Sequence, residues 1–291
     1  MAHDPALLAA RLLADGYCIV PDACDVATVN ALNADFSSRF AETPFCQGGF
    51  YGERTKRFGA LLRRSPHVDR LVRHPLILHI VDAVLRPWCD RFVLNLSQAV
   101  ELHPGALAQI PHRDQDLWPV TRPGADYQVN ILWPLTEFTP ENGATLLWPA
   151  SHRAAGAATP GGPIAAVMPP GAALLFLGSL LHGGGANMTS MVRRSVIVSY
   201  CLGWLRTFEN QYLVYPPEVA RHFDPDLAAL VGYAQHRPNL GNVEGQDPAV
   251  LLQGGGIDGL AAVDALRPDQ ADALAIFIAE QEAARAGLIG G

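Results

Sequence analysis

Short β-prone runs, separated by Pro, Gly and Asn, occupy the middle of the chain and restrict the folds open to it more than any other feature. They fall at residues 91–102, 127–135, 144–148, 173–177 and 194–204. Regularly spaced short strands of this kind are typical of a β-sandwich or barrel. We therefore expect a mainly β core over about residues 91–205.

Helical segments flank this core on both sides. Predicted helices lie at 5–14, 26–41, 66–86 and about 268–286. Pro75 divides the third of these, because proline suits a first helical turn better than a helix interior. Residues 16–20 predict a short strand that ends at Pro21, and the chain after residue 205 is irregular and Pro-rich. The pattern indicates one domain over residues 1–291.

Composition excludes several classes of protein. With 49% apolar and 17% charged residues, the chain can build a packed core and is unlike a disordered chain. The formal charge of −7 argues against a nucleic-acid-binding surface. No uninterrupted apolar run reaches the ~20 residues that a membrane span needs. The N-terminal stretch carries an early acid and no positive region, so it predicts an amphipathic helix rather than a signal peptide.

The cysteines suggest a reducing compartment. They are Cys18, Cys24, Cys46, Cys89 and Cys201. The number is odd, the positions are scattered and no CxxC pair occurs, which favours neither a disulfide framework nor a zinc knuckle. We expect a cytoplasmic protein.

The segment 109–115 carries the first candidate metal ligands. His112 and Asp114 are two residues apart, and on an extended chain such residues point to the same face. His182 follows an apolar strand at 172–177 and precedes three glycines, which makes it the natural third ligand. Two histidines and one carboxylate form the ligand set of non-haem iron(II) oxygenases. A His-x-Asp pair alone is a weak signal, since it also fits a solvated ion pair in a surface turn.

Flanking motifs bring a resemblance to a known family. His112-x-Asp is followed by Glu-Asn-Gly-Ala-Thr at 141–145, by Pro-Ala-Ser-His at 149–152, and by His182 with Asn187 and Arg193 beyond it. In this order the motifs resemble the phytanoyl-CoA dioxygenase superfamily over about residues 91–205, closest to the branch that tailors secondary metabolites. Residues 16–20 also resemble the usual start of the family.

One position departs from the family pattern. Ala150 stands where the Pro-x-Ser-His turn usually has glycine. Alanine disfavours a positive φ, so we expect a different type of turn at this point.

The resemblance implies a fold, a cofactor set and a reaction. The fold is a double-stranded β-helix (jelly-roll, cupin-like) core with flanking helices. Fe(II) is held by His112, Asp114 and His182, and 2-oxoglutarate and O₂ are the co-substrates. The implied reaction is oxidation, most simply hydroxylation, of an unactivated C–H bond of a small-molecule substrate, with release of succinate and CO₂. The substrate and the oligomeric state stay open.

The far carboxylate of 2-oxoglutarate needs a buried cation, and a guanidinium suits it. Arg193 lies eleven residues after His182, and the resemblance gives it this role. Arg194 should face the opposite side of the strand, although the reverse assignment is an alternative. Thr145 resembles a hydroxyl that binds the same carboxylate, and Gln109 an amide that contacts 2-oxoglutarate. Alternatively, Thr145 simply starts a strand and Gln109 satisfies a loop carbonyl.

Several other histidines, tryptophans and basic residues are candidates for the site, but most of them also fit structural roles. The remaining histidines considered, His74, His79, His103 and His152, are expected to form hydrogen bonds or pack. Trp133 is expected in the core. Trp118 is a candidate for the substrate entrance, and it fits a position away from the entrance equally well.

Residues 48–57 form either a lid or a surface loop. Five basic residues between positions 54 and 64 hint at an acidic portion of the substrate.

Three other functions fit the sequence less well. A cupin-like metal enzyme also uses a β-barrel but usually binds its metal with three or four histidines. A non-catalytic barrel that binds a small ligand would need neither the ligand set nor Arg193. A nucleic-acid demethylase on the same core is disfavoured by the negative charge and the missing basic stripe.

Overall fold

The structure, a computed structural model, describes residues 4–120, 122, 124–153, 161–254 and 256–289. The chain divides into two compact units, Met1–Pro216 and Pro217–Gly291. All strands of the described residues belong to the first unit. The single domain expected over residues 1–291 stays a prediction.

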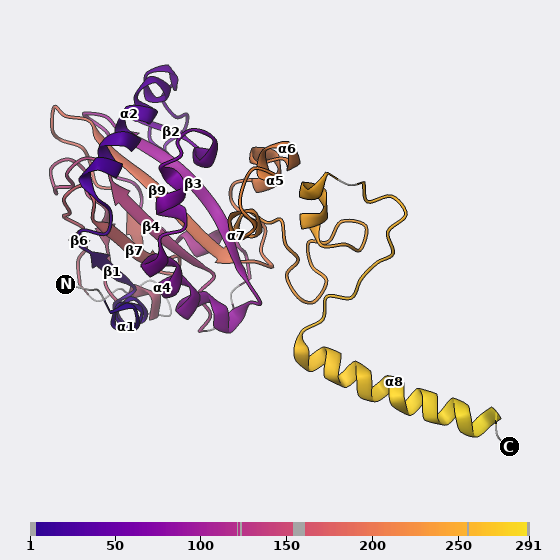
Figure 1. The fold of residues 1–291 in the computed structure, drawn as a ribbon. Coiled ribbons are helices and arrows are strands. Elements are labelled where there is room, and N and C mark those ends of the chain that lie inside the picture. Colours follow the sequence, from indigo (N-terminus) through magenta and orange to yellow (C-terminus); the bar gives the residue numbers. More distant parts are fainter. Residues whose placement is uncertain (1–3, 121, 123, 154–160, 255, 290–291) are drawn as a thin grey trace. The chain divides into compact units, whose positions relative to one another are not determined.

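A six-stranded antiparallel sheet forms the larger layer of the first unit (Figure 1). Its strands are β1 (Tyr17–Val20), β2 (Thr55–Phe58), β3 (Phe92–Leu102), β4 (Gln128–Pro134), β7 (Ala173–Leu177) and β9 (Arg193–Leu202). They are arranged in the order β1-β7-β4-β9-β3-β2, so that strands distant in sequence lie side by side. The strands expected from the sequence in this sheet are confirmed to within two residues at each end, apart from the unexpected β2.

A smaller sheet forms the second layer. It consists of β5 (Leu146–Leu147), β6 (Ile164–Ala165) and β8 (His182–Gly183), in the order β6-β5-β8. The two sheets are separate, and buried apolar side chains that include Phe138, Leu147 and Leu174 pack between them. This arrangement confirms the mainly β, jelly-roll fold class, built as two sheets rather than as one closed barrel.

Side chains of the large sheet alternate between an outer and an inner face. On β4, Trp133 points outward, where its ring lies 5.7 Å from that of His74 and only 2% of its surface is exposed. Asn130 and Leu132 point inward and line a cavity. The expectation that Trp133 belongs to the core is therefore confirmed, and the inner face is where a ligand can bind.

Helices cover the outer face. They are α1 (Pro5–Asp15), α2 (Val26–Glu42), α3 (Val68–Val72) and α4 (Pro75–Leu85), and Figure 1 shows α4 against the sheet and α1 near β1 at its lower edge. In α1, the Asp4 side chain accepts hydrogen bonds from the backbone N–H groups of Ala6 and Leu7, and Gly16 ends the helix with a φ of 84°. Pro75 occupies the first turn of α4, which confirms that it separates two helices.

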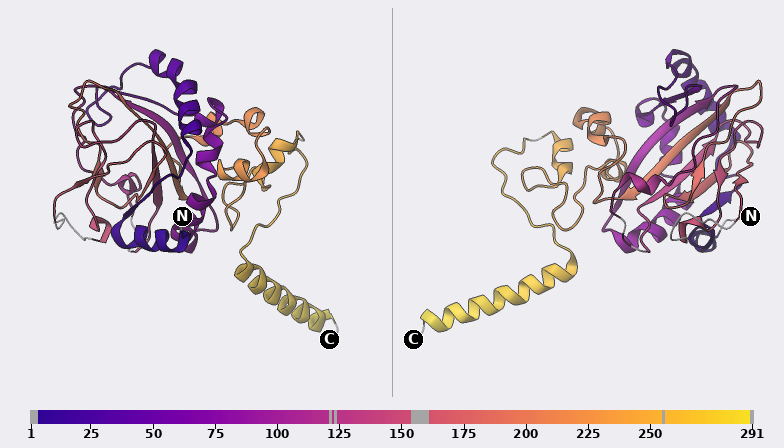
Figure 2. Two further views of the ribbon diagram at one scale, coloured as in Figure 1. Left: turned by 60° about the vertical axis from the view of Figure 1, so that its left-hand side comes forward. Right: turned by 180° about the vertical axis from the view of Figure 1, so that it is seen from behind.

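The remaining helical elements are short, except for the last. In the first unit, α5 spans Gln211–Val214 and 3₁₀ turns occur at Leu61–Arg63, Arg86–Trp88, Asp114–Leu117 and Ser151–Arg153. The second unit contains α6 (Pro217–Ala220), α7 (Pro225–Leu230), a 3₁₀ turn (Pro248–Gln253) and α8 (Pro268–Ile289). Figure 2 shows α8 as one continuous helix, which confirms the predicted terminal helix. Among the described residues, no helix is both long and apolar enough to cross a membrane.

The turn at Ala150 corrects an expectation from the sequence. Ala150 has a φ of 59°, the left-handed conformation that glycine usually supplies, so the prediction of a different turn is wrong. Hydrogen bonds hold it there: its N–H donates to the Asp15 carbonyl at 2.8 Å, and its carbonyl accepts from Arg153 N–H at 3.1 Å. These contacts offset the steric cost of about 1–2 kcal/mol that a Cβ adds in this conformation.

Candidate active site

A backbone bridge brings two histidines from distant parts of the chain together. The N–H of His112 donates to the carbonyl of His182 at 2.9 Å, and the N–H of His182 donates back at 3.0 Å. His182 lies on β8, whose pairing with β5 fixes its position in the smaller sheet. The two imidazole rings are 4.5 Å apart between centroids. Both rings therefore face the inner side of the jelly roll.

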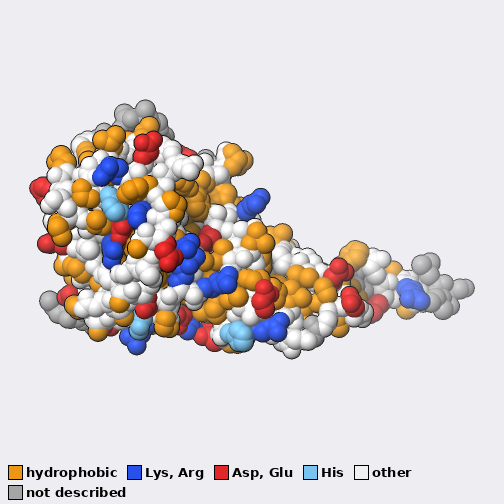
Figure 3. All heavy atoms as spheres, turned by 90° about the horizontal axis from the view of Figure 1, so that it is seen from above, with side chains coloured by type: hydrophobic (Ala, Val, Ile, Leu, Met, Phe, Trp, Pro, Cys, Tyr) orange, Lys and Arg blue, Asp and Glu red, His pale blue; other side chains and the backbone are white. Residues whose placement is uncertain are grey.

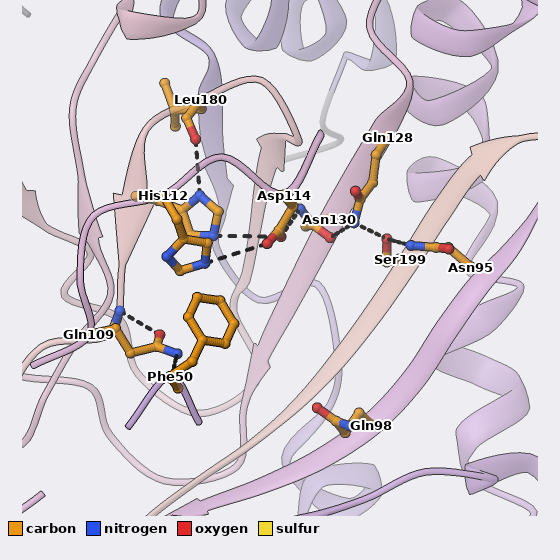
Figure 4. Close-up of polar contacts among 12 residues, drawn as sticks. Phe50, Asn95, Gln98, Gln109, His112, Asp114, Gln128, Asn130, Leu180 and Ser199 are labelled. Carbon is orange, nitrogen blue, oxygen red and sulfur yellow. Dashed lines mark hydrogen bonds and ion pairs between the residues drawn. The ribbon is translucent and has the colours of Figure 1, made fainter. Parts of the chain in front are cut away.

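Asp114 completes the cluster. The intervening Arg113 is extended, with φ −117° and ψ 124°, so residues 112 and 114 point to one side as the motif predicts. Oδ1 of Asp114 lies 3.5 Å from Nε2 of His112, and Oδ2 lies 3.6 Å from Nε2 of His182 (Figure 4). One ligand atom from each residue lies within 4.8 Å of the others. In the described part of the chain, this is the one group of three or more such residues placed to hold a metal ion.

Hydrogen bonds fix the tautomer of both histidines. Nδ1 of His112 lies 2.8 Å from the carbonyl oxygen of Ile110, and Nδ1 of His182 lies 3.0 Å from that of Leu180. A carbonyl oxygen only accepts, so each Nδ1 must carry the proton and donate it. Each neutral ring then presents the lone pair of Nε2 to the centre of the cluster. This is the arrangement that metal-binding histidines require.

Electrostatics prepare the same cluster for a cation. Burial disfavours the charged form of Asp114, but the attraction of His182 and the hydrogen bond to His112, which act when these rings are protonated and no metal is bound, outweigh it and lower the pKa of Asp114. Burial lowers the pKa of His182. Burial also opposes protonation of His112, but hydrogen bonds to Asp114 and Ile110 leave its pKa raised. The donor set of one ionised carboxylate and two imidazoles suits a divalent transition metal.

A buried amide network orients the carboxylate from behind. Asn130 Nδ2 donates to Oδ2 of Asp114 at 2.9 Å, and its own Oδ1 accepts from Gln128 Nε2 at 2.8 Å. Gln128 also donates to Ser199 Oγ at 2.8 Å, which in turn accepts from Asn95 Nδ2 at 3.3 Å (Figure 4). This network was not predicted from the sequence. The polar residues at alternate positions of an apolar strand, 128 and 130, were the available signal.

A cavity of about 360 Å³ opens beside the three side chains. Its wall combines the inner faces of β3, β4 and β9 with the segments around residues 50 and 208. The lining residues used below are Phe50, Tyr51, Arg57, Gln98, Gln109, Thr145, Arg193 and Phe208, together with the cluster itself. The cavity therefore joins the candidate metal site to all three residues expected to contact 2-oxoglutarate.

Arg193 lies in the wall of this cavity with only 6% of its surface exposed. One Nη1 hydrogen bond goes to the Gly143 carbonyl, and the guanidinium lies 4.3 Å from the ring centre of Phe138. Its Nε has no hydrogen-bond partner, and no acidic side chain pairs with it among the described residues. Burial, followed by the like charge of Arg57, lowers its pKa to about 9. A buried cation without a counter-ion suits an anionic ligand.

Arg194 faces the other side of the sheet, as strand alternation predicts. Its Nε lies 2.7 Å from Oε2 of Glu101, and its guanidinium lies 5.0 Å from the ring centre of Phe40 on α2. The reverse assignment of the two arginines would require Arg194 inside, where the structure has Arg193.

Thr145 and Gln109 both line the cavity, at different places. Thr145 directly precedes β5 and lies two residues from Gly143, the hydrogen-bond partner of Arg193. Gln109 joins two segments: its Oε1 accepts from Gly184 N–H at 2.9 Å, and its Nε2 donates to the Phe50 carbonyl at 3.0 Å. Gln109 thus satisfies a loop carbonyl, and its contact with 2-oxoglutarate stays a prediction.

The segment 48–57 supplies part of the cavity wall. Phe50 lies edge-on to the ring of His112 at 4.9 Å, and Tyr51 and Arg57 also line the cavity (Figure 4). By contrast, Trp118 is outside the lining set of the described residues and donates its indole N–H to the Arg206 carbonyl at 3.1 Å.

The other histidines have separate partners or lie on the surface. His74 caps α4, and its Nε2 lies 2.9 Å from the Ala23 carbonyl. His103 lies 2.6 Å from Glu101, and His152 lies 3.1 Å from the Leu13 carbonyl. His79 is exposed on α4. Their expected roles in hydrogen bonding and packing agree with these positions.

Fold and site together define a class of protein: a double-stranded β-helix with two histidines and one carboxylate facing an inner cavity. Residues 12–195 match the phytanoyl-CoA dioxygenase (PhyH) family. The chain belongs to this family and is a non-haem iron, 2-oxoglutarate-dependent dioxygenase. This confirms the resemblance inferred from the motifs.

Similar proteins from fungi, which are named dioxygenases, agree with this family membership. The chain is 43% identical over 190 residues to dioxygenase trt7 of Aspergillus terreus, a match covering 62% of this chain and 66% of trt7. It is 32% identical over 243 residues to dioxygenase aneA of Aspergillus aculeatus, covering 77% of this chain and 81% of aneA.

Solved structures share the fold. The epimerase SnoN from nogalamycin biosynthesis, described as α-ketoglutarate dependent, superposes with a TM-score of 0.58 at 22% identity. The match covers 69% of this chain and 82% of SnoN. HygX from Streptomyces hygroscopicus, solved with nickel and 2-oxoglutarate bound, gives a TM-score of 0.56 at 16% identity over 72% of this chain and 90% of HygX.

Proposed function

We propose that this dioxygenase holds iron(II) with His112, Asp114 and His182, binds 2-oxoglutarate through Arg193, and hydroxylates an unactivated C–H bond of a small molecule. One observation carries the proposal. Two Nε2 lone pairs and an ionised carboxylate converge beside a cavity whose wall also contains the buried Arg193 guanidinium, which has no acidic partner among the described residues. A two-histidine, one-carboxylate set leaves coordination positions open for a co-substrate and O₂.

Each residue has a definite task in this proposal. Bound iron supplies the oxidative chemistry with 2-oxoglutarate and O₂, and the products include succinate and CO₂. His112 and His182 present neutral nitrogens, because their Nδ1 protons are held by backbone carbonyls. Asn130 fixes the orientation of Asp114. Arg193 pairs with the far carboxylate of 2-oxoglutarate, assisted by the hydroxyl of Thr145 and, at the metal end, by Gln109.

The substrate in this proposal is a small metabolite rather than a nucleic acid. The net charge of −7 disfavours nucleic acid, and the face in Figure 3 mixes acidic, basic and apolar side chains. SnoN has been solved with nogalamycin RO and HygX with hygromycin B, which are small molecules. We further place the enzyme in the reducing cytoplasm, with which five free cysteines agree.

Reactions other than hydroxylation are alternatives. SnoN is described as an epimerase, and SnoK, a second structural neighbour from nogalamycin biosynthesis, is described as a carbocyclase. A cupin-like site with three or four histidines is disfavoured, since His112 and His182 are the histidines among the described cavity-lining residues. A ligand-binding barrel without catalysis would release no succinate.

Succinate release tests the proposal. The full-length protein, loaded anaerobically with iron(II), is given 2-oxoglutarate, O₂ and a library of small metabolites. We expect succinate formation stimulated by at least one metabolite, and a product heavier by one oxygen atom. His112→Ala and Asp114→Ala should abolish turnover, whereas His79→Ala, on the exposed side of α4, should not. Full activity of either cluster variant would overturn the ligand assignment, and an unchanged product mass would overturn hydroxylation.

A further inference from the structure

The Pro-Ala-Ser-His turn at residues 149–152 has no part in the proposed function, although its serine is fully buried. Ser151 begins a 3₁₀ turn that directly follows the left-handed Ala150. A buried hydroxyl is unfavourable unless it forms hydrogen bonds. The groups that bond to Ser151 therefore indicate what this turn does.

The hydroxyl of Ser151 holds the segment that carries His182. Its Oγ accepts a hydrogen bond from the N–H of Leu181 at 2.8 Å. The carbonyl of Leu181 accepts from the N–H of Trp148 at 3.0 Å, so both backbone polar groups of Leu181 are bonded. Leu181 directly precedes His182 in the chain. These two contacts thus fix the backbone next to one of the metal ligands.

The carbonyl of Ser151 holds the segment that carries the other two ligands. It accepts a hydrogen bond from Nη2 of Arg113 at 3.0 Å. Arg113 lies between His112 and Asp114, and its extended backbone sends its side chain to the side opposite theirs. The contact can therefore fix this segment without occupying the space between the ligands. Through its two oxygen atoms, Ser151 is bonded to sequence neighbours of all three ligands.

The turn itself is fixed to the end of α1. The N–H of Ala150 donates to the Asp15 carbonyl at 2.8 Å. The carbonyl of Leu13 accepts from Nη2 of Arg153 at 2.8 Å and lies 3.1 Å from Nε2 of His152. The position of the turn is therefore set by contacts outside both ligand segments, and the turn can serve as their common support.

We infer that Ser151 is a positioning residue of the metal centre, which sets the separation of His182 from the pair His112 and Asp114. This inference rests on the proposed function, since it assumes that these three side chains bind the metal. Without the hydroxyl, the Leu181 N–H would lose its partner, and the segment that carries His182 could move. A metal ion would then have to order its ligands as it binds, and its affinity would fall.

Metal titration without turnover tests the inference. Full-length wild-type protein and Ser151→Ala are titrated anaerobically with Mn(II) by calorimetry. We expect the dissociation constant of the variant to rise by about tenfold or more, since loss of a group that supports a metal ligand typically weakens binding about 10- to 100-fold. Ser151→Thr keeps the hydroxyl and should bind Mn(II) more tightly than Ser151→Ala. The absorption spectrum of bound Co(II), which reports the ligand geometry, should change in Ser151→Ala.

Ser97→Ala is the matched control. Ser97 is also fully buried, and its Oγ accepts a hydrogen bond from the N–H of Leu61 at 3.3 Å. It lies on β3 next to Gln98, which lines the cavity, so the two side chains point to opposite faces of the sheet. Ser97→Ala should lower the melting temperature, as Ser151→Ala does, but it should leave the Mn(II) affinity and the Co(II) spectrum unchanged.

Arg113→Gln tests the second contact and leaves the buried serine intact. It removes the hydrogen bond to the Ser151 carbonyl, so Mn(II) should again bind more weakly. Loss of a positive charge near the site would by itself favour a cation, so weaker binding would report the geometry of the ligands. This variant keeps the inference testable if Ser151→Ala does not fold, because wild-type or tighter Mn(II) binding by Arg113→Gln would overturn it.

The outcomes separate this inference from the proposed function. Failure of the wild-type protein to bind Mn(II) would overturn both. Normal binding by the wild type, together with a Ser151→Ala variant that melts at a lower temperature but keeps its Mn(II) affinity and Co(II) spectrum, would overturn the positioning role alone. A loss of Mn(II) affinity in Ser97→Ala as large as that in Ser151→Ala would also overturn it, because the effect would then follow general destabilisation.

Discussion

Replacing Arg193 by glutamine should weaken 2-oxoglutarate binding severely. In the structure the guanidinium is buried, has no acidic partner among the described residues and faces the cavity that contains the metal cluster. With 2-oxoglutarate bound, the substitution would leave a carboxylate buried without a cation. Breaking a buried ion pair in this way costs about 3–5 kcal/mol. The dissociation constant should then rise by roughly 10²- to 10⁴-fold.

Calorimetric titration of Mn(II)-loaded protein with 2-oxoglutarate measures this change directly. Arg194→Gln is the matched control: it removes the adjacent arginine, which pairs with Glu101 on the other face of the sheet. Its effect on affinity should stay within about twofold, as for a substitution remote from the ligand. Unchanged 2-oxoglutarate affinity in Arg193→Gln, or a large loss in Arg194→Gln only, would refute the reasoning.

The same substitution has an opposite effect on the ligand-free protein. Burial of the unpaired charge lowers the pKa of Arg193 to about 9, well below the ordinary value of a guanidinium, so the folded form binds this proton less tightly than the unfolded form. The penalty is fully present below pH 9 and diminishes as the pH rises from 9 towards the pKa of the unfolded form. Without ligand, Arg193→Gln should therefore not lower the melting temperature at pH 7, and a marked decrease would contradict the unpaired state of this residue.

Three further predictions concern the support of the site. Asn130→Ala removes the hydrogen bond to Asp114, so metal titration should give about 10- to 100-fold weaker binding, and wild-type affinity would contradict its orienting role. Ala150→Gly removes the steric strain of an alanine in the left-handed conformation and should stabilise the protein by about 1 kcal/mol in thermal unfolding. Ala150→Val should destabilise the protein, and the reverse order of the two variants would be inconsistent with the φ of 59°. Because the pKa of His112 is raised above 6.5, protons should compete with the metal already above that pH, and metal affinity that stays constant from pH 8 to 6 would count against His112 as a ligand.

The longer strands and the cluster could be predicted from the sequence because their signals are local. β7, for example, is an unbroken apolar run between glycines, and its predicted bounds of 173–177 match the structure. The convergence of His112 and Asp114 follows from an extended residue between them. The distant His182 was found through its motif, since no local pattern connects it with residue 112.

The strands β2, β6 and β8 were not expected, because they are two to four residues long and exist only through pairing with distant partners. For the same reason, the sequence did not distinguish Arg57 from the other four basic residues between positions 54 and 64. Only the register of β2 with β3 turns its side chain into the cavity. At Ala150, reasoning from the intrinsic preference of alanine failed because long-range hydrogen bonds determine the turn.

A crystal structure of the protein grown anaerobically with Mn(II) and 2-oxoglutarate would be the most direct test of how the site is occupied. We predict a metal ion bound by Nε2 of His112, Nε2 of His182 and a carboxylate oxygen of Asp114, with the far carboxylate of 2-oxoglutarate on Arg193. A metal held by other side chains, or 2-oxoglutarate extended away from Arg193, would contradict the assignment on which every proposal here depends.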